Sequence, residues 1–335
     1  MGTTRWSNSA YHARVAQLRA AGRSAFGHDD DVRQGRASAG VHPLLDPAKI
    51  KGGVRESRDS ANHPASRAVA VLCDVTGSMS EVPQIVQHHL CELFDLLVDR
   101  KYLVDPAVLI GGIGDATCDS APLQVGQFES GNEIDDDLSR LYLEGGGGGQ
   151  KTESYELGLY FLARKTAIDC HLNRGQKGYA FLIGDELPYA RVKRKEVAML
   201  FGDKLEADIP IKQIVAEVQQ KWNLYFILPN MTSYYNDPEI LKCWRGLLGQ
   251  NVLQLPDPEA ISETIASTIG LAEGTADMAR VTEDLAKGGS SSSLIGSVAQ
   301  TLLHLTAAVG LNAAAKAMGG ALGVAALGAM GLEDK

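Results

Sequence analysis

The sequence predicts an α/β domain in which a doubly wound, mostly parallel sheet is flanked by helices. Short apolar runs, typical of strands buried on both faces, alternate with helical periods of ten or more residues. Polar residues with acidic and hydroxyl side chains directly follow two of these runs. Strands alternating with helices imply right-handed crossovers, so we expect this Rossmann-like domain to span residues 66–275.

The elements of this domain follow in chain order. The buried-strand candidates are Ala68–Cys73, Ala107–Ile113, Tyr179–Ile183, Leu224–Leu228 and Val252–Leu255, and the alternating run Leu123–Phe128 indicates an edge strand. The helical periods are Val82–Arg100, Ile134–Leu143, Ser154–Ala167, Ile211–Lys221, Asp237–Leu248 and Pro258–Ile269.

Residues 1–65 precede this domain as a basic, partly helical extension. Up to Arg67 the chain carries eleven Lys and Arg residues against six Asp and Glu residues. Such a segment is either a partner-binding arm or a solvated, partly disordered leader. The first ten residues lack the apolar stretch of a secretory signal.

The chain after the domain is expected to form a Gly/Ser linker over 276–293 and a helical tail over 294–335. The run Gly288–Ser293 is flexible by composition, and the tail is rich in Ala, Gly and Leu. Polar residues interrupt the tail, which argues against a membrane span. A small-residue helix pair that packs on itself or on a partner, with Gly319 and Gly323 at GxxxG spacing, is favoured over membrane contact or a poorly ordered end.

Charge and cysteine usage limit the partners and the compartment. The net charge of −9 would repel nucleic acid phosphates and anionic lipid, so nucleic acid is not an expected partner. The five cysteines are odd in number and contain no CxxC pair, which suggests neither disulfides nor a zinc site. We therefore expect a cytoplasmic protein.

Candidate ligands for a cation follow the predicted strands. Asp74, Thr76 and Ser78 follow the first strand, Asp185 follows the strand that ends at Ile183, and Thr152 follows a Gly-rich loop. In a doubly wound sheet the carboxyl ends of the strands form the ligand-binding edge. Two carboxylates and three hydroxyls form an all-oxygen set that suits Mg²⁺, or else Mn²⁺ or Ca²⁺.

The Asp-x-Thr-x-Ser triplet, the later Thr152 and the later Asp185 resemble the metal-ion-dependent adhesion site of von Willebrand factor A domains. Thr76 stands where that family more often has serine and keeps the hydroxyl, whereas the glycine run before Thr152 is longer than usual. The resemblance implies a metal-bound module that captures an Asp or Glu of a partner protein. Proteins of this type often work beside AAA+ ATPases, so the resemblance also implies such a partner.

Residues near the expected ligands have secondary roles in this interpretation. Asp115, Glu153 and Glu186 are candidates for hydrogen bonds to the ligands or to metal-bound water. Tyr234 and Tyr235 follow the strand ending at Leu228 and are candidates for contact with a partner.

Other interpretations of the same residues remain open. Asp74 and its neighbours also fit a helix N-cap. The run 145–152 approaches a phosphate-binding GxxxxGK[ST] loop but has Gln150 in place of the second glycine. Aspartyl-phosphate phosphatases need a carboxylate where Thr76 stands. We therefore expect recognition without catalysis, with a self-assembling structural protein as the main alternative and a metal-dependent phosphatase or nucleotide hydrolase as a third.

Overall fold

The central feature of the molecule is a six-stranded sheet with the strand order β12-β11-β7-β2-β3-β4. The structure, a computed structural model, describes residues 4–146 and 149–317. The strands are β2 (Arg67–Asp74), β3 (Pro106–Ile113), β4 (Leu123–Val125), β7 (Gly178–Ile183), β11 (Trp222–Pro229) and β12 (Val252–Leu255). Only β4 runs antiparallel to its neighbour. The predictions of a mostly parallel sheet and of an edge strand beginning at Leu123 are confirmed; the strand ends at Val125, and its antiparallel direction was not predicted.

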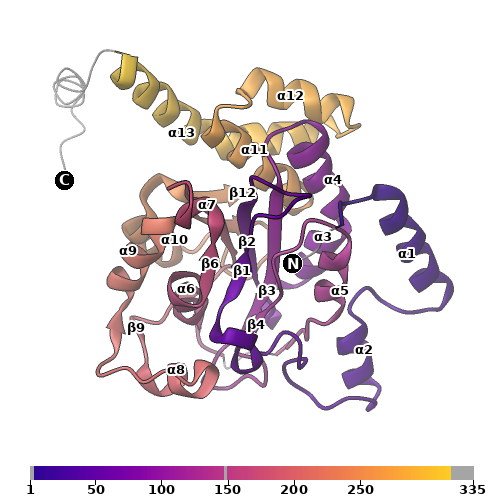
Figure 1. Cartoon of the computed structure of the whole chain (residues 1–335), viewed down its shortest axis with the longest axis vertical. Coiled ribbons are helices and arrows are strands. Elements are labelled where there is room, and N and C mark those ends of the chain that lie inside the picture. The colour runs from indigo at the N-terminus through magenta and orange to yellow at the C-terminus, as the bar shows by residue number, and fades with distance from the viewer. Residues whose placement is uncertain (1–3, 147–148, 318–335) are drawn as a thin grey trace.

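Helices cover both faces of the sheet (Figure 1). On one side lie α3 (Val82–His88), α4 (Leu90–Phe94), α5 (Glu133–Ser139) and α11 (Ile261–Glu273). On the other lie α6 (Tyr155–Arg164), α8 (Arg194–Phe201), α9 (Ile211–Lys221) and α10 (Pro238–Leu248). Strand β2 shows why two cores form, because Val69, Val71 and Cys73 enter the first core and their alternating neighbours enter the second.

Short elements connect the sheet and the helices that cover it. The strands are β1 (Arg55–Ser57), β5 (Thr152–Glu153), β6 (Thr166–Ile168), β8 (Leu187–Pro188), β9 (Arg191–Val192) and β10 (Ile209–Pro210), and the short α-helix is α7 (Asp169–Leu172). The 3-10 turns are η1 (Pro47–Lys49), η2 (Lys51–Gly53), η3 (Gly77–Met79), η5 (Gly249–Asn251) and η6 (Pro258–Ala260). The π-helical turn η4 (Asp95–Asp99) follows α4.

Three expected helices are shorter than their apolar patterns, and one of them, expected to reach Leu143, is α5 and ends at Ser139. The period over 82–100 is divided into α3, α4 and η4, with a break at His89. The period over 154–167 ends at Arg164, because Thr166–Ile168 form β6 and pair with β1. Such a pairing joins segments about a hundred residues apart, which a local pattern does not reveal.

The N-terminal extension packs against the domain. It forms α1 (Asn8–Ala20), α2 (Gly27–Arg33) and β1, and buries Tyr11, Phe26 and Leu45 in the first core. The Tyr11 hydroxyl donates to the carbonyl oxygen of Gln87 over 2.7 Å. The described part of the extension is therefore an ordered layer of the fold, in contrast to a solvated leader.

The C-terminal region also differs from the expected linker and tail. Within residues 276–293, α12 (Met278–Lys287) buries Val281 and Leu285 in the first core. Helix α13 (Ser292–Ala317) follows and buries Val298 and Leu302 in the same core. The Gly319/Gly323 spacing lies outside the described residues. Among the residues described, no helix is long and apolar enough to cross a membrane.

Candidate functional site at the carboxyl edge of the sheet

The candidate site lies where the strand order of the sheet reverses. Strands β2 and β7 are neighbours, and the chain continues from β2 toward β4 on one side and from β7 toward β12 on the other. Asp74 ends β2, and Asp185 comes two residues after β7 ends. The carboxyl ends of parallel strands around such a reversal form a crevice that commonly binds ligands.

Asp74 is fully buried and is held by the turn that follows it. Its Oδ1 accepts a hydrogen bond from the Thr76 backbone N–H over 2.9 Å and one from the Thr76 hydroxyl over 2.6 Å. The alternative that Asp74 merely caps a helix does not describe this geometry, because its carboxylate bonds the turn before η3 and the next long helix begins only at Val82.

Ser78 connects this turn to Asp185. Its hydroxyl donates to Asp185 Oδ1 over 2.8 Å, and it lies 3.3 Å from the Thr76 hydroxyl. The second oxygen of Asp185 accepts from the Tyr234 backbone N–H over 3.0 Å. Asp74 with Thr76 and Asp185 with Ser78 therefore form two hydrogen-bonded pairs, and their hydroxyls bring the two pairs within 3.3 Å of each other.

Thr152 is not part of this group of described side chains. It lies in β5, and β5 pairs with β8 so that Thr152 is opposite Leu187. The pairing brings the segment after the Gly-rich loop alongside the segment that carries Asp185, and the Thr152 side chain is half-buried. Its placement is thus fixed by backbone pairing with Leu187–Pro188, the segment that follows Asp185.

The described glycines at the start of the Gly-rich loop rest on the first loop. The Gly77 N–H donates to the Gly146 carbonyl oxygen over 2.8 Å. A Cβ at residue 77 would lie 3.1 Å from that oxygen and 3.2 Å from the carbonyl oxygen of Gly145. Glycine at position 77 therefore permits the two loops to come into backbone contact.

Sequence reasoning missed Tyr155, which completes the surroundings of Asp74. Its buried hydroxyl donates to Asp74 Oδ2 over 2.6 Å. Gly184 makes room for this ring, because a Cβ there would lie 2.0 Å from the tyrosine oxygen. A glycine before the acidic turn and a tyrosine at the first position of α6 are visible in the sequence, but their contact depends on the packing of α6.

The three neighbouring carboxylates have different surroundings. Asp115 is fully buried and accepts from the Thr117 N–H at 2.8 Å and from the Tyr189 hydroxyl at 2.9 Å, with Gln150 as a third partner. Glu153 and Glu186 are also buried, and the Oε2 atom of each has no hydrogen-bond partner among the described residues. The polar network that holds Asp115 was not predicted.

Burial raises the pKa of several of these carboxyls. Burial raises the pKa of Asp74 to about 6, while hydrogen bonds from Thr76 and Tyr155 act in the opposite direction. Burial, together with the charge of Asp74, also raises the pKa values of Glu153 and Glu186. Closely spaced buried acids disfavour one another's charged forms, and a cation placed among them would reverse that effect.

Tyr234 and Tyr235 lie in the loop after β11. The backbone of Tyr234 contacts Asp185, and the Lys151 ammonium lies 5.6 Å from the centre of the Tyr234 ring. The loop residues 230–238 line an open hollow of about 460 Å³. Both tyrosines follow β11 at the carboxyl edge, and both are half-buried, which leaves part of each residue exposed.

The donor set can be tested for a metal by its chemistry. Among the described residues, no three His, Cys, Asp or Glu side chains are grouped as ligands of one metal ion. The predicted set contains only two carboxylates and relies on hydroxyls for the rest. Oxygens in adjacent positions around Mg²⁺ at about 2.1 Å are about 3.0 Å apart, and around Ca²⁺ at about 2.4 Å they are about 3.4 Å apart. The 3.3 Å between the Thr76 and Ser78 hydroxyls fits this range.

Comparison with known proteins gives only distant similarities. No protein-family model matches the sequence, and no curated protein matches it either. Solved structures that resemble it include the open conformation of the pilus adhesin SpaC from Lactobacillus rhamnosus GG, with 11% identity, a TM-score of 0.42, and coverage of 62% of this chain and 30% of that chain. Another is proximal thread matrix protein 1 from the mussel byssus, with 12% identity, a TM-score of 0.39, and coverage of 61% and 47%. The chain thus matches less than half the length of either protein.

Proposed function

We propose that this chain is a metal-dependent protein-recognition module of the von Willebrand factor A type. Its carboxyl edge would hold Mg²⁺, or Mn²⁺ or Ca²⁺, through Asp74, Thr76, Ser78, Asp185 and Thr152. A partner protein would present an Asp or Glu to that cation. The module would bind without catalysing a reaction.

The observation that carries this proposal is the arrangement of the Thr76 and Ser78 hydroxyls. Each donates its hydrogen to a different carboxylate, Thr76 to Asp74 and Ser78 to Asp185. A hydroxyl oxygen that donates in this way keeps lone pairs for another interaction. Two such oxygens 3.3 Å apart form half of a small oxygen cage beside two acids, which is the environment that hard cations prefer.

The choice of ligands explains why such a site would favour an acidic partner. A bound divalent cation acts as a Lewis acid that accepts an oxygen of the partner's carboxylate. Because hydroxyls are neutral, the chain neutralises the cation less than an all-carboxylate site would. A partner's Asp or Glu would supply part of the missing negative charge.

The edge is open enough for a partner to approach. Gly77 and Ser233 are exposed, and Ser78 is half-buried although Asp74 beside it is not exposed at all. The loop with Tyr234 and Tyr235 borders the same place. A carboxylate would thus meet a polar centre bordered by aromatic rings, and aromatic residues are enriched at protein interfaces.

The test is affinity purification of the full chain from its own cells, with Mg²⁺ or with EDTA. We expect a defined partner to be retained with Mg²⁺ and lost with EDTA. The Asp74→Asn and Ser78→Ala variants should lose it under both conditions. The matched control is Glu283→Gln, which changes an exposed carboxylate on α12, a helix at the opposite end of the molecule (Figure 1). Retention of the same partner by both site variants, or in EDTA, would refute the proposal.

The rival proposal is a structural protein that assembles through its C-terminal segment while the site stabilises the fold. The packing of α13 against the domain limits how this can be tested, because removing α13 would expose Val298 and Leu302. Shortening the chain after Ala317 keeps the described helix. A smaller oligomer on light scattering would then support assembly through residues 318–335, and an unchanged size would contradict it.

A further inference from the structure

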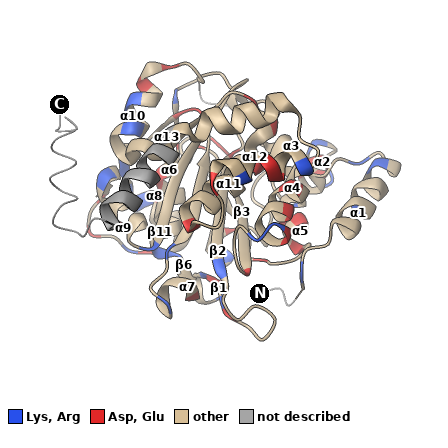
Figure 2. Ribbon diagram, turned by 90° about the horizontal axis from the view of Figure 1, so that it is seen from above, with Lys and Arg blue, Asp and Glu red and all other residues tan. Residues whose placement is uncertain are grey.

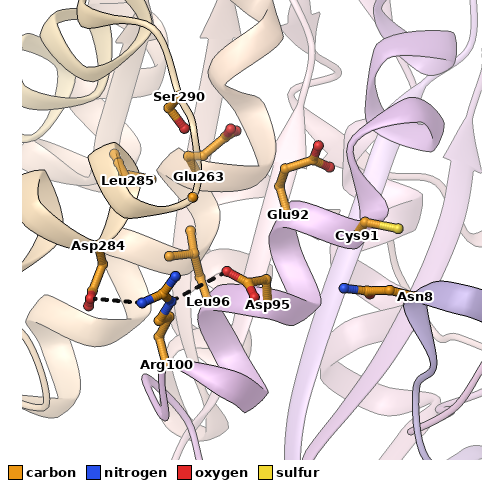
Figure 3. Close-up of a pocket in the computed structure, with 11 residues that line it drawn as sticks. Asn8, Cys91, Glu92, Asp95, Leu96, Arg100, Glu263, Asp284, Leu285 and Ser290 are labelled. Atoms are coloured by element: carbon orange, nitrogen blue, oxygen red, sulfur yellow. Dashed lines mark ion pairs between the residues drawn. The ribbon is translucent and has the colours of Figure 1, made fainter.

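A second polar cavity lies at the other end of the molecule from the carboxyl edge. It has a volume of about 230 Å³ and is bounded by α1, α4, η4, α11 and α12. Figure 3 shows side chains from these elements converging on it, with Glu92 and Asp95 on one wall and Glu263 and Asp284 on the other. Figure 2 looks onto this end and shows acidic residues around α4, α5 and α12.

The charges around the cavity do not balance. The described residues that line it include the four acids named above and one base, Arg100. Arg100 lies between two of the acids, with Nε 3.6 Å from Asp95 and Nη1 3.7 Å from Asp284. Arg280 also pairs with Asp284, at 3.3 Å. Two of the four acids therefore have basic partners in the wall.

Glu263 and Glu92 differ from that pair. Glu263, in the first turn of α11, is only 2% exposed, and no described residue hydrogen-bonds its Oε2. Burial raises the pKa of Glu263 to about 7. Glu92 Oε2 makes no hydrogen bond within the described structure either, and its nearest base is His89, at 3.7 Å. A buried acceptor without a donor costs free energy unless a ligand satisfies it.

Two histidines on neighbouring elements bear on these charges: His89, and His12 of α1, whose Nε2 lies 3.9 Å from Cys91 Sγ and which acts on Glu92. His89 lies at the junction of α3 and α4. Besides Glu92 it also pairs with Glu259 on η6, whose Oε2 lies 2.7 Å from His89 Nε2. Asp257 adds a further negative charge near Glu263. His89 therefore offsets part of the charge of Glu92, which keeps lone pairs for a further donor, while no described residue hydrogen-bonds Glu263 Oε2.

We propose that this cavity binds a primary ammonium group on an aliphatic chain. Such a group has three N–H donors, enough for Glu263 Oε2, for Glu92 Oε2 beside its long ion pair with His89, and for one further acceptor. Leu96 and Leu285 also line the cavity and give the hydrocarbon an apolar surface. The described acids are not grouped as ligands of a single metal ion, so an extended organic cation matches their spread better than an inorganic one.

The size of the cavity and the form of its wall agree with such a ligand. A volume of 230 Å³ is that of several water molecules at about 30 Å³ each, which is room for a four-carbon diamine. Asp95 and Leu96 belong to the π-helical turn η4, and single π-turns within helices are frequent at functional sites. The same chemistry could come from a free diamine or from a lysine side chain.

The test is isothermal titration of the full chain with 1,4-diaminobutane at about pH 8, above the pKa of Glu263, where the carboxylate is charged. In parallel, a blocked Gly-Lys-Gly peptide tests the lysine side chain, and 1,4-butanediol tests chain length without charge. We expect saturable binding of the diamine or of the peptide, whichever is the source, and none of the diol. Absence of binding by both amines, or equal binding of the diol, would overturn the proposal.

Variants connect the binding to the named carboxylates. Glu263→Gln and Glu92→Gln should each weaken amine binding at least about tenfold, because each removes a charge-assisted hydrogen bond. Glu283→Gln, on the exposed side of α12, should leave it unchanged. Glu263→Gln should also keep or raise the melting temperature of the ligand-free chain, since a buried charge disappears. Amine binding unchanged in Glu263→Gln would exclude this site.

Discussion

The substitution Asp74→Asn separates two effects of the buried carboxylate: the loss of folding stability caused by its charge, and its contribution to binding a cation. Asparagine has nearly the shape of aspartate but carries no charge, and Asp74 has no exposed surface through which water could stabilise that charge. In the absence of a divalent cation the substitution should therefore stabilise the fold. In the presence of Mg²⁺ it should remove a stabilisation that the wild-type chain gains.

The size of the first effect follows from the pKa of Asp74. A rise from 3.8 to about 6 corresponds to about 3 kcal/mol against the charged form in the folded state. The sign follows from linkage. The loss of folding stability caused by the charged Asp74 is absent below the pKa of the unfolded chain, grows as the pH rises toward the pKa of the folded chain, and is complete above it. At about pH 8 in EDTA, the asparagine variant should thus be more stable by up to about 3 kcal/mol.

The size of the second effect follows from mass action. A ligand that binds only the folded chain adds about 2.7 kcal/mol at a hundred times its dissociation constant. In a chain of 335 residues, that corresponds to a rise of about 4 °C in the melting temperature. The wild type should show this rise with Mg²⁺, and Asp74→Asn should show none.

The assay is thermal and urea unfolding of both proteins at about pH 8, in EDTA and in Mg²⁺. The control is Glu283→Gln, which should follow the wild type in both solutions. A variant that is less stable than the wild type in EDTA would refute the electrostatic reasoning. A variant that keeps the full response to Mg²⁺ would refute the metal site, whatever its stability in EDTA.

Three further predictions concern other contacts. Tyr155→Phe removes the hydroxyl that donates to Asp74. It should therefore lower the free energy of unfolding by about 2 kcal/mol, measured by urea unfolding in EDTA. A loss below about 0.5 kcal/mol would contradict this prediction. Pairing with glutamates, mainly Glu92, raises the pKa of His89 to about 9, so His89→Gln should cost about 1 kcal/mol near pH 6, allowing for screening at exposed partners. That difference should vanish in unfolding curves as the pH rises past about 9. Leu302→Ala should cost about 2–5 kcal/mol if α13 is part of the core, whereas an unchanged urea midpoint would mean that the helix is detachable.

The sequence predicts the sheet well because each of its long strands is a continuous apolar run. The run around Val71 is buried on both faces, so no other element type satisfies its pattern at that length. Asp74 follows such a run directly and Asp185 follows one after Gly184, and their positions at one edge follow from the parallel sheet alone. The hydrogen bond from Ser78 to Asp185 then requires only that β2 and β7 be neighbours.

Contacts between separate elements could not be predicted in the same way. The Tyr155 hydroxyl reaches Asp74 because of where α6 packs along the face of the sheet. A local sequence pattern does not contain that information. The pairing of β1 with β6 and the burial of Tyr11 likewise depend on segments far apart in the chain. Helix α12 could have been predicted. Asp277 is a favourable N-cap residue, and Val281 and Leu285 follow it at helical spacing, but the nearby Gly/Ser run led to the expectation of a linker.

The hydrogen bonds that hold Thr76 and Ser78 also have a consequence for kinetics. Because both hydroxyls are already fixed against carboxylates, the first and third loops need little rearrangement to receive an ion. The rate of loading would then be governed by the ion itself, and Mg²⁺ gives up its hydration water reluctantly. Exchange of Ca²⁺ at this edge should therefore be faster than exchange of Mg²⁺, with the polypeptide setting neither rate.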